Sequence, residues 1–275
     1  MTTPHGSFQT PAFMTVGTKG TVKGIYPALL RGVGAEVLLG NTYHLLLRPG
    51  PDTVRSLGGL HSMMGWDGPI LTDSGGYQAY SMADINAVDD DGVTFKSVVD
   101  GSMIRMTPES SMQIQNSLGA DIIMAFDDCP PSVDPTAGPV NQTRIRLAQQ
   151  RDSGRRKQYD HESRLRQAND RTARWLERCK AAHARPTEQA LFGIVQGGTN
   201  PEMRARSAEA VTAVDLPGYA IGGVAVGELT DDIRRVTEQT APLLPESKPR
   251  YLMGVGYEHD IVSAVRAGVD MFDCV

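Results

Sequence analysis

Short apolar runs recur along the chain, and each ends in a glycine or a polar residue. Helical segments separate most of them. Such alternation predicts a parallel sheet, and eight units predict one closed (β/α)8 TIM barrel over residues 1–275. A doubly wound sheet is the weaker alternative because no GxGxxG follows the first run. The eight runs are Pro11 to Val16, Glu36 to Leu39, Ile70 to Thr72, Asp121 to Phe126, Leu191 to Val195, Gly218 to Ile221, Arg250 to Met253 and Asp270 to Phe272.

The third run carries the clearest chemical signal. Ile70 to Thr72 delivers Asp73, and the chain then breaks at Gly75 and Gly76. A buried strand of this kind presents its last residue outside the sheet, and glycines let backbone N–H groups approach a ligand closely. Asp73 is therefore predicted at the end of the barrel where parallel α/β proteins carry their chemistry.

Local signals predict further elements between the runs. Asp100-Gly101 is a strong hairpin signal between Val93–Val98 and Met103–Met106, so two antiparallel strands are expected after the third barrel strand. A helix is expected from Thr107-Pro108-Glu109 to about Leu118, and another over Ser163 to Ala182. Asn200 and Thr230 are expected to cap two later helices.

Charge gives a mixed signal about nucleic acid. The net charge of −5 does not favour such a partner, so RNA binding would depend on a local patch. A basic insert over Gly138 to Lys157 overlaps a basic run from Arg144 to Arg166, which is either a solvated face or a phosphate-binding patch. That run holds eight basic residues, Arg144, Arg146, Arg151, Arg155, Arg156, Lys157, Arg164 and Arg166, against three acidic ones, Asp152, Asp160 and Glu162.

The cysteines and the ends of the chain bear on its setting. Cys129, Cys179 and Cys274 show no metal-ligand spacing, which argues against a disulfide framework and against a metal site among these residues. The absence of a basic-then-apolar leader and of a membrane-length run favours the cytoplasm. Because the chain stops after the eighth run, without a final helix, we expect a C-terminal truncation.

Three carboxylates stand at strand ends: Asp73, Asp127 and Asp273. Barrel geometry brings them to one pocket with Gln196, and paired carboxylates can cleave a glycosidic bond through a covalent intermediate. Simpler interpretations remain open. A single aspartate can be a cap or an ion-pair member, Gly222-Gly223 can serve helix–strand packing, and Tyr77, Met253, His44 and His183 can be purely structural.

Long motifs in order make the chain similar to the tRNA-guanine transglycosylase (queuine tRNA-ribosyltransferase) family. The resemblance runs from Thr10 to Val275. It implies exchange of guanine at the wobble position (34) of the tRNA anticodon for a 7-deazaguanine, in queuosine biosynthesis. The matching segments are TPAFMTVGTKGTVKG, GNTYHLLLRPG, LTDSGGYQ, SMQIQNSLGADIIMAFDDCP, LFGIVQGG, YAIGGVAVGE and RYLMGVGYEHDIVSAVRAGVDMFDCV.

The resemblance assigns roles residue by residue. Asp273 matches the nucleophile that attacks C1′ of the ribose and forms a ribosyl-aspartate intermediate, and Asp73 matches the general acid/base. A flipped loop base needs stacking faces and hydrogen-bonding edges, which suits these assignments. The implied substrate-binding residues are Asp73, Ser74, Gly75, Gly76, Tyr77, Asp127, Gln196, Gly223 and Met253, and the implied RNA-binding residues are Gly254, Val255, Gly256, Tyr257, Glu258, His259 and Asp260.

The resemblance also bears on which 7-deazaguanine is inserted and on which parts of the family's fold would lie beyond this chain. Cys129 and Val226 match the bacterial type, which inserts preQ1 (7-aminomethyl-7-deazaguanine), whereas Asp128 is closer to the queuine-inserting eukaryotic type. The family's zinc (Zn2+) subdomain and last helix would lie beyond Val275, so no metal ligands are expected in this chain. A homodimer is implied for the full-length protein.

Two other functions compete with the catalytic transglycosylase. A non-catalytic tRNA-binding partner subunit would have no need to retain Asp73 and Asp273. A barrel glycosidase acting on a free nucleoside would suit the acidic balance but not the basic insert.

Overall fold

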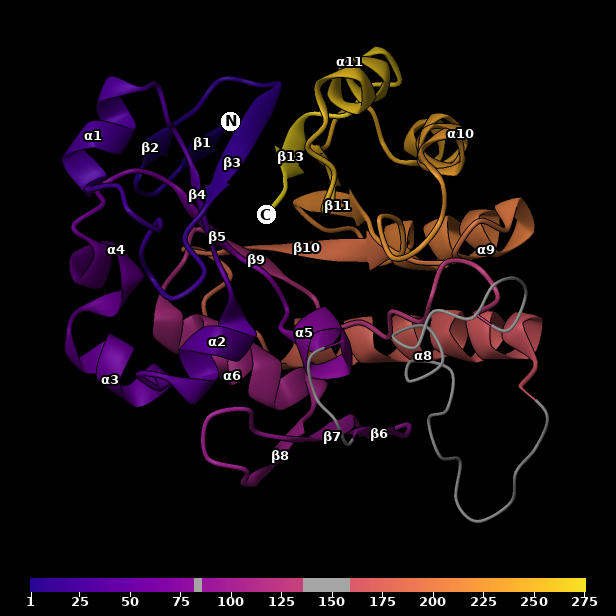
Figure 1. The fold of residues 1–275 in the computed structure, drawn as a ribbon, viewed down its shortest axis with the longest axis horizontal. Coiled ribbons are helices and arrows are strands. Elements are labelled where there is room, and N and C mark those ends of the chain that lie inside the picture. Colours follow the sequence, from indigo (N-terminus) through magenta and orange to yellow (C-terminus); the bar gives the residue numbers. More distant parts are fainter. Residues whose placement is uncertain (82–85, 136–158) are drawn as a thin grey trace.

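The computed structural model describes residues 1–81, 86–135 and 159–275. Eight parallel strands close into a barrel in strict chain order, as the sequence predicts. Figure 1 shows the last strand, β13, beside the first barrel strand, β3, and residues 271–273 pair with residues 12–14 to close the ring. The barrel strands are β3 (Ala12–Val16), β4 (Leu38–Gly40), β5 (Ile70–Thr72), β9 (Ile122–Met124), β10 (Ala190–Val195), β11 (Gly218–Ile221), β12 (Arg250–Leu252) and β13 (Met271–Asp273).

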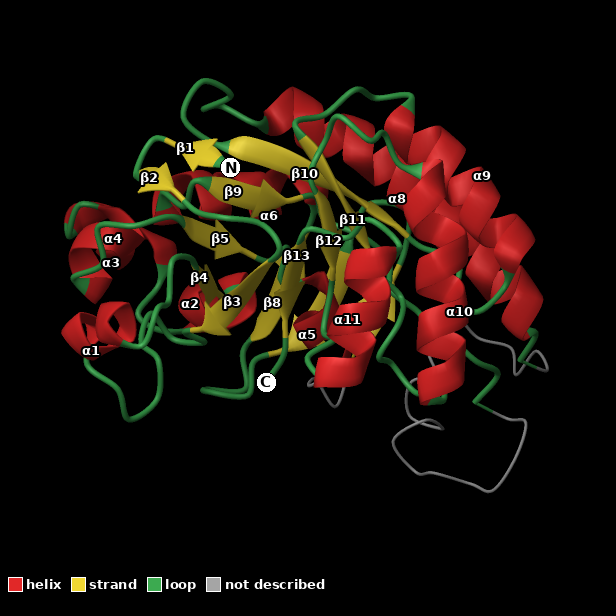
Figure 2. Ribbon diagram, turned by 90° about the horizontal axis from the view of Figure 1, so that it is seen from above, coloured by secondary structure: helices red, strands yellow, loops and turns green. Residues whose placement is uncertain are grey.

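Helices surround these strands (Figure 2), with α8 to α11 along one side and α1, α3 and α4 along another. The arrangement is that of a (β/α)8 TIM barrel. The helices are α1 (Pro27–Gly32), α2 (Thr42–Leu47), α3 (Pro51–Ser56), α4 (Gly59–Met64), α5 (Gly76–Ser81), α6 (Pro108–Leu118), α8 (His161–Ala182), α9 (Pro201–Thr212), α10 (Thr230–Thr240) and α11 (Glu258–Arg266), with a short 3-10 turn η1 (Ala241–Leu243).

The strand alternation divides the core in two. One cluster fills the barrel interior and includes Met14, Leu71 and Phe192, while another lies between the strands and the helices and includes Ile70 and Leu191. Successive residues of a strand point to opposite faces, so neighbours such as Ile70 and Leu71 belong to different clusters. The interior is therefore a packed core, and any pocket must lie at one of its two ends.

The excursion after β5 differs from the prediction of two strands. It contains three antiparallel strands, β6 (Asn86–Val88), β7 (Val93–Lys96) and β8 (Met103–Met106). Asp89 closes the extra turn because its Oδ1 accepts hydrogen bonds from the N–H groups of Asp91 and Gly92. Asp91-Gly92 in this turn is the same kind of pair as the Asp100-Gly101 that marks the second turn, and β6 was not predicted because it is only three residues long.

Arginines of α8 hold this excursion against the barrel. Arg171 and Arg174 pair with the Asp90 carboxylate, and the Trp175 indole N–H donates to the Asp90 carbonyl at 2.8 Å. Arg178 forms two charge-assisted hydrogen bonds with Glu109 at 2.7 and 2.8 Å. The three-stranded sheet is thus fixed to the helix that follows β9.

Two of the predicted helix starts are confirmed and one is wrong. Thr107 caps α6 in a capping box with Ser110, and the Asn200 side chain accepts from the first-turn N–H groups of α9. Thr230 is instead the first residue of α10, preceded by Leu229 without a side-chain cap. Asp231 and Asp232 in the first turn favour the helix start through the helix dipole.

A small hairpin precedes the barrel. Its strands β1 (Thr2–Thr3) and β2 (Gly6–Ser7) pair in antiparallel fashion, and Phe8 after it is buried with the barrel-interior cluster. The hairpin covers the amino end of the barrel, since the His5 side chain and backbone both contact Asp121, which precedes β9.

Candidate active site

The strand alternation directs one polar or sulfur side chain after another into the carboxyl end of the barrel. Leu71, Ile194, Tyr251 and Met271 belong to the interior cluster. Two residues further along each strand come Asp73, Gln196, Met253 and Asp273, which the same alternation places on the inward face. The carboxylates predicted at strand ends therefore surround one mouth.

Asp73 is buried and firmly held. The Asn41 side-chain amide donates to its Oδ2 at 2.7 Å, and the Thr42 backbone N–H donates to its Oδ1 at 2.6 Å. Burial raises the pKa of Asp73 from 3.8 to about 6, against the lowering effect of Asn41, Thr42 and Gln78, and the charge of Asp273 raises it further. A carboxyl group with a pKa near 6 can both accept and donate a proton near neutral pH.

Asp127 is the second buried carboxylate of the site. The Gln196 amide donates to its Oδ2 at 2.6 Å and the Ser74 hydroxyl to its Oδ1 at 3.1 Å. Burial is again the main cause that raises the pKa of Asp127 to about 6. Gln196 is itself 1% exposed, and its Oε1 has no hydrogen-bond partner among the described residues. This pair thus presents acceptor oxygens toward the mouth.

Asp273 lies on the last strand with two donors on one oxygen. The Tyr251 hydroxyl donates to its Oδ1 at 2.6 Å and the Gly254 N–H at 2.8 Å. Burial raises the pKa of Asp273, while these two hydrogen bonds lower it. Burial is the main cause that raises the pKa of Tyr251, and the charges of Asp273 and Asp73 raise it further, so both carboxylates lie near this hydroxyl. One oxygen of Asp273 is fixed by these donors, and the other is the one left to face a ligand.

Gly223 has two local reasons to be glycine. Its φ is +61°, and a Cβ there would lie 2.3 Å from Gln196 Oε1. The buried Arg204 fixes this loop by donating to the carbonyls of Gly222 at 2.6 Å and Gly223 at 3.0 Å. Because its carbonyl is directed to Arg204, the Gly223 peptide is held in one orientation beside Gln196.

Two predicted ring neighbours lie at the mouth. Tyr77, at the start of α5, is 42% exposed, and the charge of Cys129 contributes to its raised pKa after burial. Met253 Sδ would lie 3.6 Å from a Cβ on Gly222. Both side chains therefore border the same loops as Asp127 and Gln196, and neither belongs to the buried core.

The predicted RNA-binding stretch is exposed only in part. Val255 and Asp260 are buried, and Asp260 pairs with Arg234 at 2.8 Å. Tyr257 is 73% exposed and stacks on His259 with ring centroids 5.9 Å apart. An exposed aromatic pair thus lies three residues beyond the N–H that holds Asp273.

The predicted basic patch is partly accounted for. Arg164 forms a bidentate ion pair with the fully buried Asp128, which Arg171 also contacts, and Arg166 pairs with Glu162. The Arg164 guanidinium is therefore paired with a carboxylate of the protein itself. The insert over 138–157 and the basic residues 144–157 lie outside the described residues.

Several residues that hold the carboxylates were not predicted as site residues. Asn41, Thr42 and Gln78 hold Asp73, while Tyr251 holds Asp273 and Arg204 fixes the Gly222-Gly223 loop. The signal for Asn41 was present, since it follows the second apolar run as Asp73 follows the third. Arg204 carried no such signal because it lies in the middle of a helix.

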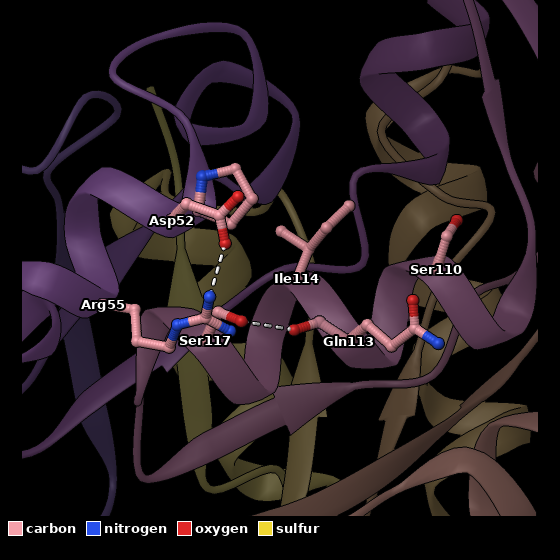
Figure 3. Close-up of a pocket in the computed structure, with 7 residues that line it drawn as sticks. Asp52, Arg55, Ser110, Gln113, Ile114 and Ser117 are labelled. Carbon is pink, nitrogen blue, oxygen red and sulfur yellow. Dashed lines mark hydrogen bonds and ion pairs between the residues drawn. The ribbon is translucent and has the colours of Figure 1, made fainter.

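A hollow on the outer surface lies between α3 and α6 (Figure 3). Its Arg55–Asp52 ion pair is solvent-exposed, and the hydroxyl of Ser117 donates to the Gln113 carbonyl within the helix. None of the strand-end carboxylates lines it. The lining residues are Pro51, Asp52, Arg55, Ser110, Gln113, Ile114 and Ser117.

Comparison with known proteins identifies the family. The family model described as queuine tRNA-ribosyltransferase matches residues 1–275. The chain belongs to this family. A queuine tRNA-ribosyltransferase of Gloeobacter violaceus is 52% identical over 99% of this chain and 65% of that protein. Those of Synechococcus elongatus and Thermus thermophilus are each 51% identical over 99% of the chain and 64% of their own length. The chain thus spans just under two thirds of these relatives.

The three cysteines of this queuine tRNA-ribosyltransferase family member lie apart from one another, and the zinc ligands that the resemblance implies would lie beyond Val275. Cys129 and Cys179 are buried on different elements, and the Cys179 thiol accepts from the Phe126 N–H at 3.3 Å. Cys274 lies against Gly256. Over the described ranges these three thiols form no common ligand group, and the group of potential ligands found there is His5, His61 and Asp121.

Within residues 1–81, 86–135 and 159–275, no helix is long and apolar enough to cross a membrane.

The raised pKa values give this family member an unusual pH dependence of stability. Asp73 and Asp127 bind protons more tightly when folded, so their contribution is complete below about pH 4 and is lost as pH rises through 6. A shift from 3.8 to about 6 corresponds to roughly 3 kcal/mol for each carboxyl group. We expect urea unfolding of Asp127→Asn to show higher stability than wild type at pH 8 and a smaller difference at pH 5. An equal difference at both pH values would contradict the assignment.

Proposed function

We propose that this chain carries the catalytic barrel of a tRNA-guanine transglycosylase, which replaces guanine at position 34 of the anticodon by preQ1. The observation that supports it most directly is the meeting of Asp73 and Asp273 at one barrel mouth, beside the Asp127–Gln196 pair. Membership of the queuine tRNA-ribosyltransferase family supports the reaction class.

Asp273 acts as the nucleophile. Its free carboxylate oxygen attacks C1′ of the ribose, the C1′–N9 bond to guanine breaks, and an ester joins Asp273 to the ribose. The Tyr251 hydroxyl and Gly254 N–H hold the other oxygen and so orient the attack. The departing guanine takes the electron pair of the broken bond and a proton from water, and the proton that Asp73 later takes from the incoming base is released to water.

Asp73 carries out the proton transfers. The incoming 7-deazaguanine loses its ring N–H proton to Asp73, its ring nitrogen attacks C1′, and the ester electrons return to Asp273. Two displacements at C1′ restore the original configuration. A pKa of about 6 suits Asp73 to this role, since the group is mostly ionised at neutral pH yet easily protonated.

The base is read by its edge and held by its faces. The Asp127 carboxylate accepts from the N–H groups of a guanine-like edge, and Gln196 and the Gly223 backbone contact the rest of that edge. Ser74 orients Asp127, and a Cβ on Gly76 would lie 2.9 Å from the Asp127 carbonyl oxygen, so glycine there lets the turn pack against the Asp127 backbone. Tyr77 and Met253 sandwich the ring from opposite faces.

The tRNA is held beside this pocket by residues 254–260. Tyr257 and His259 offer exposed stacking faces for loop nucleotides, while Val255 and Asp260 act from the interior by shaping the loop. Since the net charge is −5, RNA binding requires local basic groups, for which the insert over 138–157 is the candidate. A homodimer is proposed for the full-length protein.

The choice of preQ1 over queuine rests on Cys129 and Val226, which match the bacterial, preQ1-inserting type, whereas Asp128 is closer to the queuine-inserting type. The alternatives are a queuine-inserting enzyme and a non-catalytic tRNA-binding subunit. Asp73 is retained in a buried, hydrogen-bonded position and Asp273 in a hydrogen-bonded one, which speaks against the second.

A washout assay tests this proposal. tRNA labelled with tritiated guanine at position 34 is incubated with the chain and with preQ1, queuine or unlabelled guanine. We expect loss of label with all substrates that bind, fastest with preQ1. Faster release with queuine would reverse the substrate assignment, and tRNA binding without any release would favour the non-catalytic subunit.

A further inference from the structure

A cluster of two histidines and one aspartate lies at the opposite end of the barrel from the active-site carboxylates. Asp121 directly precedes β9 and is 2% exposed. His61 belongs to α4, and His5 lies in the turn of the β1–β2 hairpin. Three segments that are far apart in the sequence therefore meet at the amino face.

Both imidazoles point one ring nitrogen at the same carboxylate. His5 Nδ1 lies 2.8 Å from Asp121 Oδ1, and His61 Nε2 lies 3.0 Å from Asp121 Oδ2. The two rings stack with centroids 3.5 Å apart and an interplanar angle of 14°. Both nitrogens lie beside the same carboxylate because each is within hydrogen-bond distance of one of its oxygens.

The carboxylate is oriented independently of the histidines' rings. The Ile70 backbone N–H donates to Oδ2 at 2.9 Å, and the His5 backbone N–H donates to Oδ1 at 3.1 Å. Each oxygen keeps a further lone pair for the imidazole side. Backbone hydrogen bonds of this kind commonly fix a metal-binding carboxylate in its ligating orientation.

We propose that His5, His61 and Asp121 bind one divalent transition-metal ion, with zinc as the ion to test. The three potential ligand atoms lie within 4.8 Å of one another, and nitrogens with a carboxylate oxygen are ligands that zinc accepts. Ligand atoms around a tetrahedral zinc are about 3.3 Å apart at bond lengths of about 2.0 Å. The ligand atoms are therefore close to the required spacing, and the two stacked rings would tilt so that their in-plane lone pairs face the ion. Water would supply the fourth ligand, since the His5 side chain is 43% exposed.

This site is separate from the cysteine-rich zinc subdomain that the family resemblance implies. Its ligands hold the N-terminal hairpin and α4 against the start of β9, so the ion would strengthen the barrel floor and take no part in base exchange. The competing interpretation is a metal-free clamp in which both imidazoles donate N–H protons to Asp121.

Substitution by glutamine separates these interpretations. A glutamine at position 61 can still donate an N–H to Asp121 but is a poor zinc ligand, and His61→Gln therefore preserves the clamp while removing the metal. His5→Gln removes the other imidazole ligand from the exposed hairpin, where the fold is least at risk. His183→Gln is the matched control, because His183 contacts Asn116 and the Gln189 carbonyl away from the cluster.

The test is a calorimetric titration of the metal-free chain with Zn2+, together with thermal unfolding and X-ray absorption of the zinc complex. We expect one ion per chain, a raised Tm, and a zinc shell of nitrogen and oxygen without sulfur at about 2.3 Å. His61→Gln and His5→Gln should each weaken binding by at least about 10- to 100-fold, and His183→Gln should not. No saturable binding, equal binding by all three variants, or a sulfur-containing shell would overturn the proposal.

Discussion

Asp273→Asn is expected to abolish the covalent adduct between the protein and tRNA. Wild-type protein quenched in denaturant during turnover should carry tRNA on a denaturing gel, because an ester to C1′ survives loss of the fold. The amide of asparagine is a far weaker nucleophile than a carboxylate, so exchange should fall by roughly 10⁴- to 10⁶-fold. Tyr251 and Gly254 can still donate to the remaining oxygen, so the fold should persist.

Asp270→Asn is the matched control for this substitution. Asp270 precedes the same strand and accepts from the Arg250 N–H at the opposite end, away from the mouth. It should retain the adduct and exchange. An adduct that survives in Asp273→Asn would remove Asp273 from the nucleophile role and turn attention to Asp73.

Asp73→Asn is expected to reduce exchange by about 10²- to 10⁴-fold and to change its pH dependence. In wild type, kcat/KM should decline as pH falls through about 6, because Asp73 must be ionised to take the proton of the incoming base. Asparagine does not titrate, so the remaining activity should lose this acidic limb. Affinity for tRNA should change little, since Asp73 is 6% exposed and is held by Asn41 and Thr42.

Two variants make the pH experiment specific. Asp127 also has a pKa of about 6, and Asp127→Asn should raise KM for the base while keeping the acidic limb that Asp73 produces. Asp52→Asn, in the exposed hollow between α3 and α6, should match wild type throughout. If Asp127→Asn lost the limb and Asp73→Asn kept it, the proton-transfer role would belong to Asp127.

The barrel was predictable because its signal is repetitive. Each of the eight apolar runs overlaps one barrel strand, and the inward and outward alternation follows from the strand period. The additional strand of the excursion is β6 (Asn86–Val88), the first of the three in chain order. It was not predicted because it is short and its turn is closed by the side chain of Asp89. The start of α10 shifted by one residue, since no side chain there fixes the cap.

The site was predictable as a set of positions but not as a network. Strand ends placed Asp73, Asp127, Gln196 and Asp273, and the structure brings them to one mouth. Their roles stay predictions. The residues that hold them come from other segments, and Arg204 reaches its carbonyls only after α9 packs on the barrel. Tertiary proximity of this kind leaves no local pattern in a single sequence.

Closure of the ring by β3 and β13 makes the assembly of this site an all-or-none event. Asp73 belongs to the first half of the chain and Asp273 to its last strand, which is docked between β12 and β3. In a partly folded chain, Asp73 is therefore not yet accompanied by Asp273. Under the proposed function, base exchange therefore becomes possible only when the last strand has closed the ring.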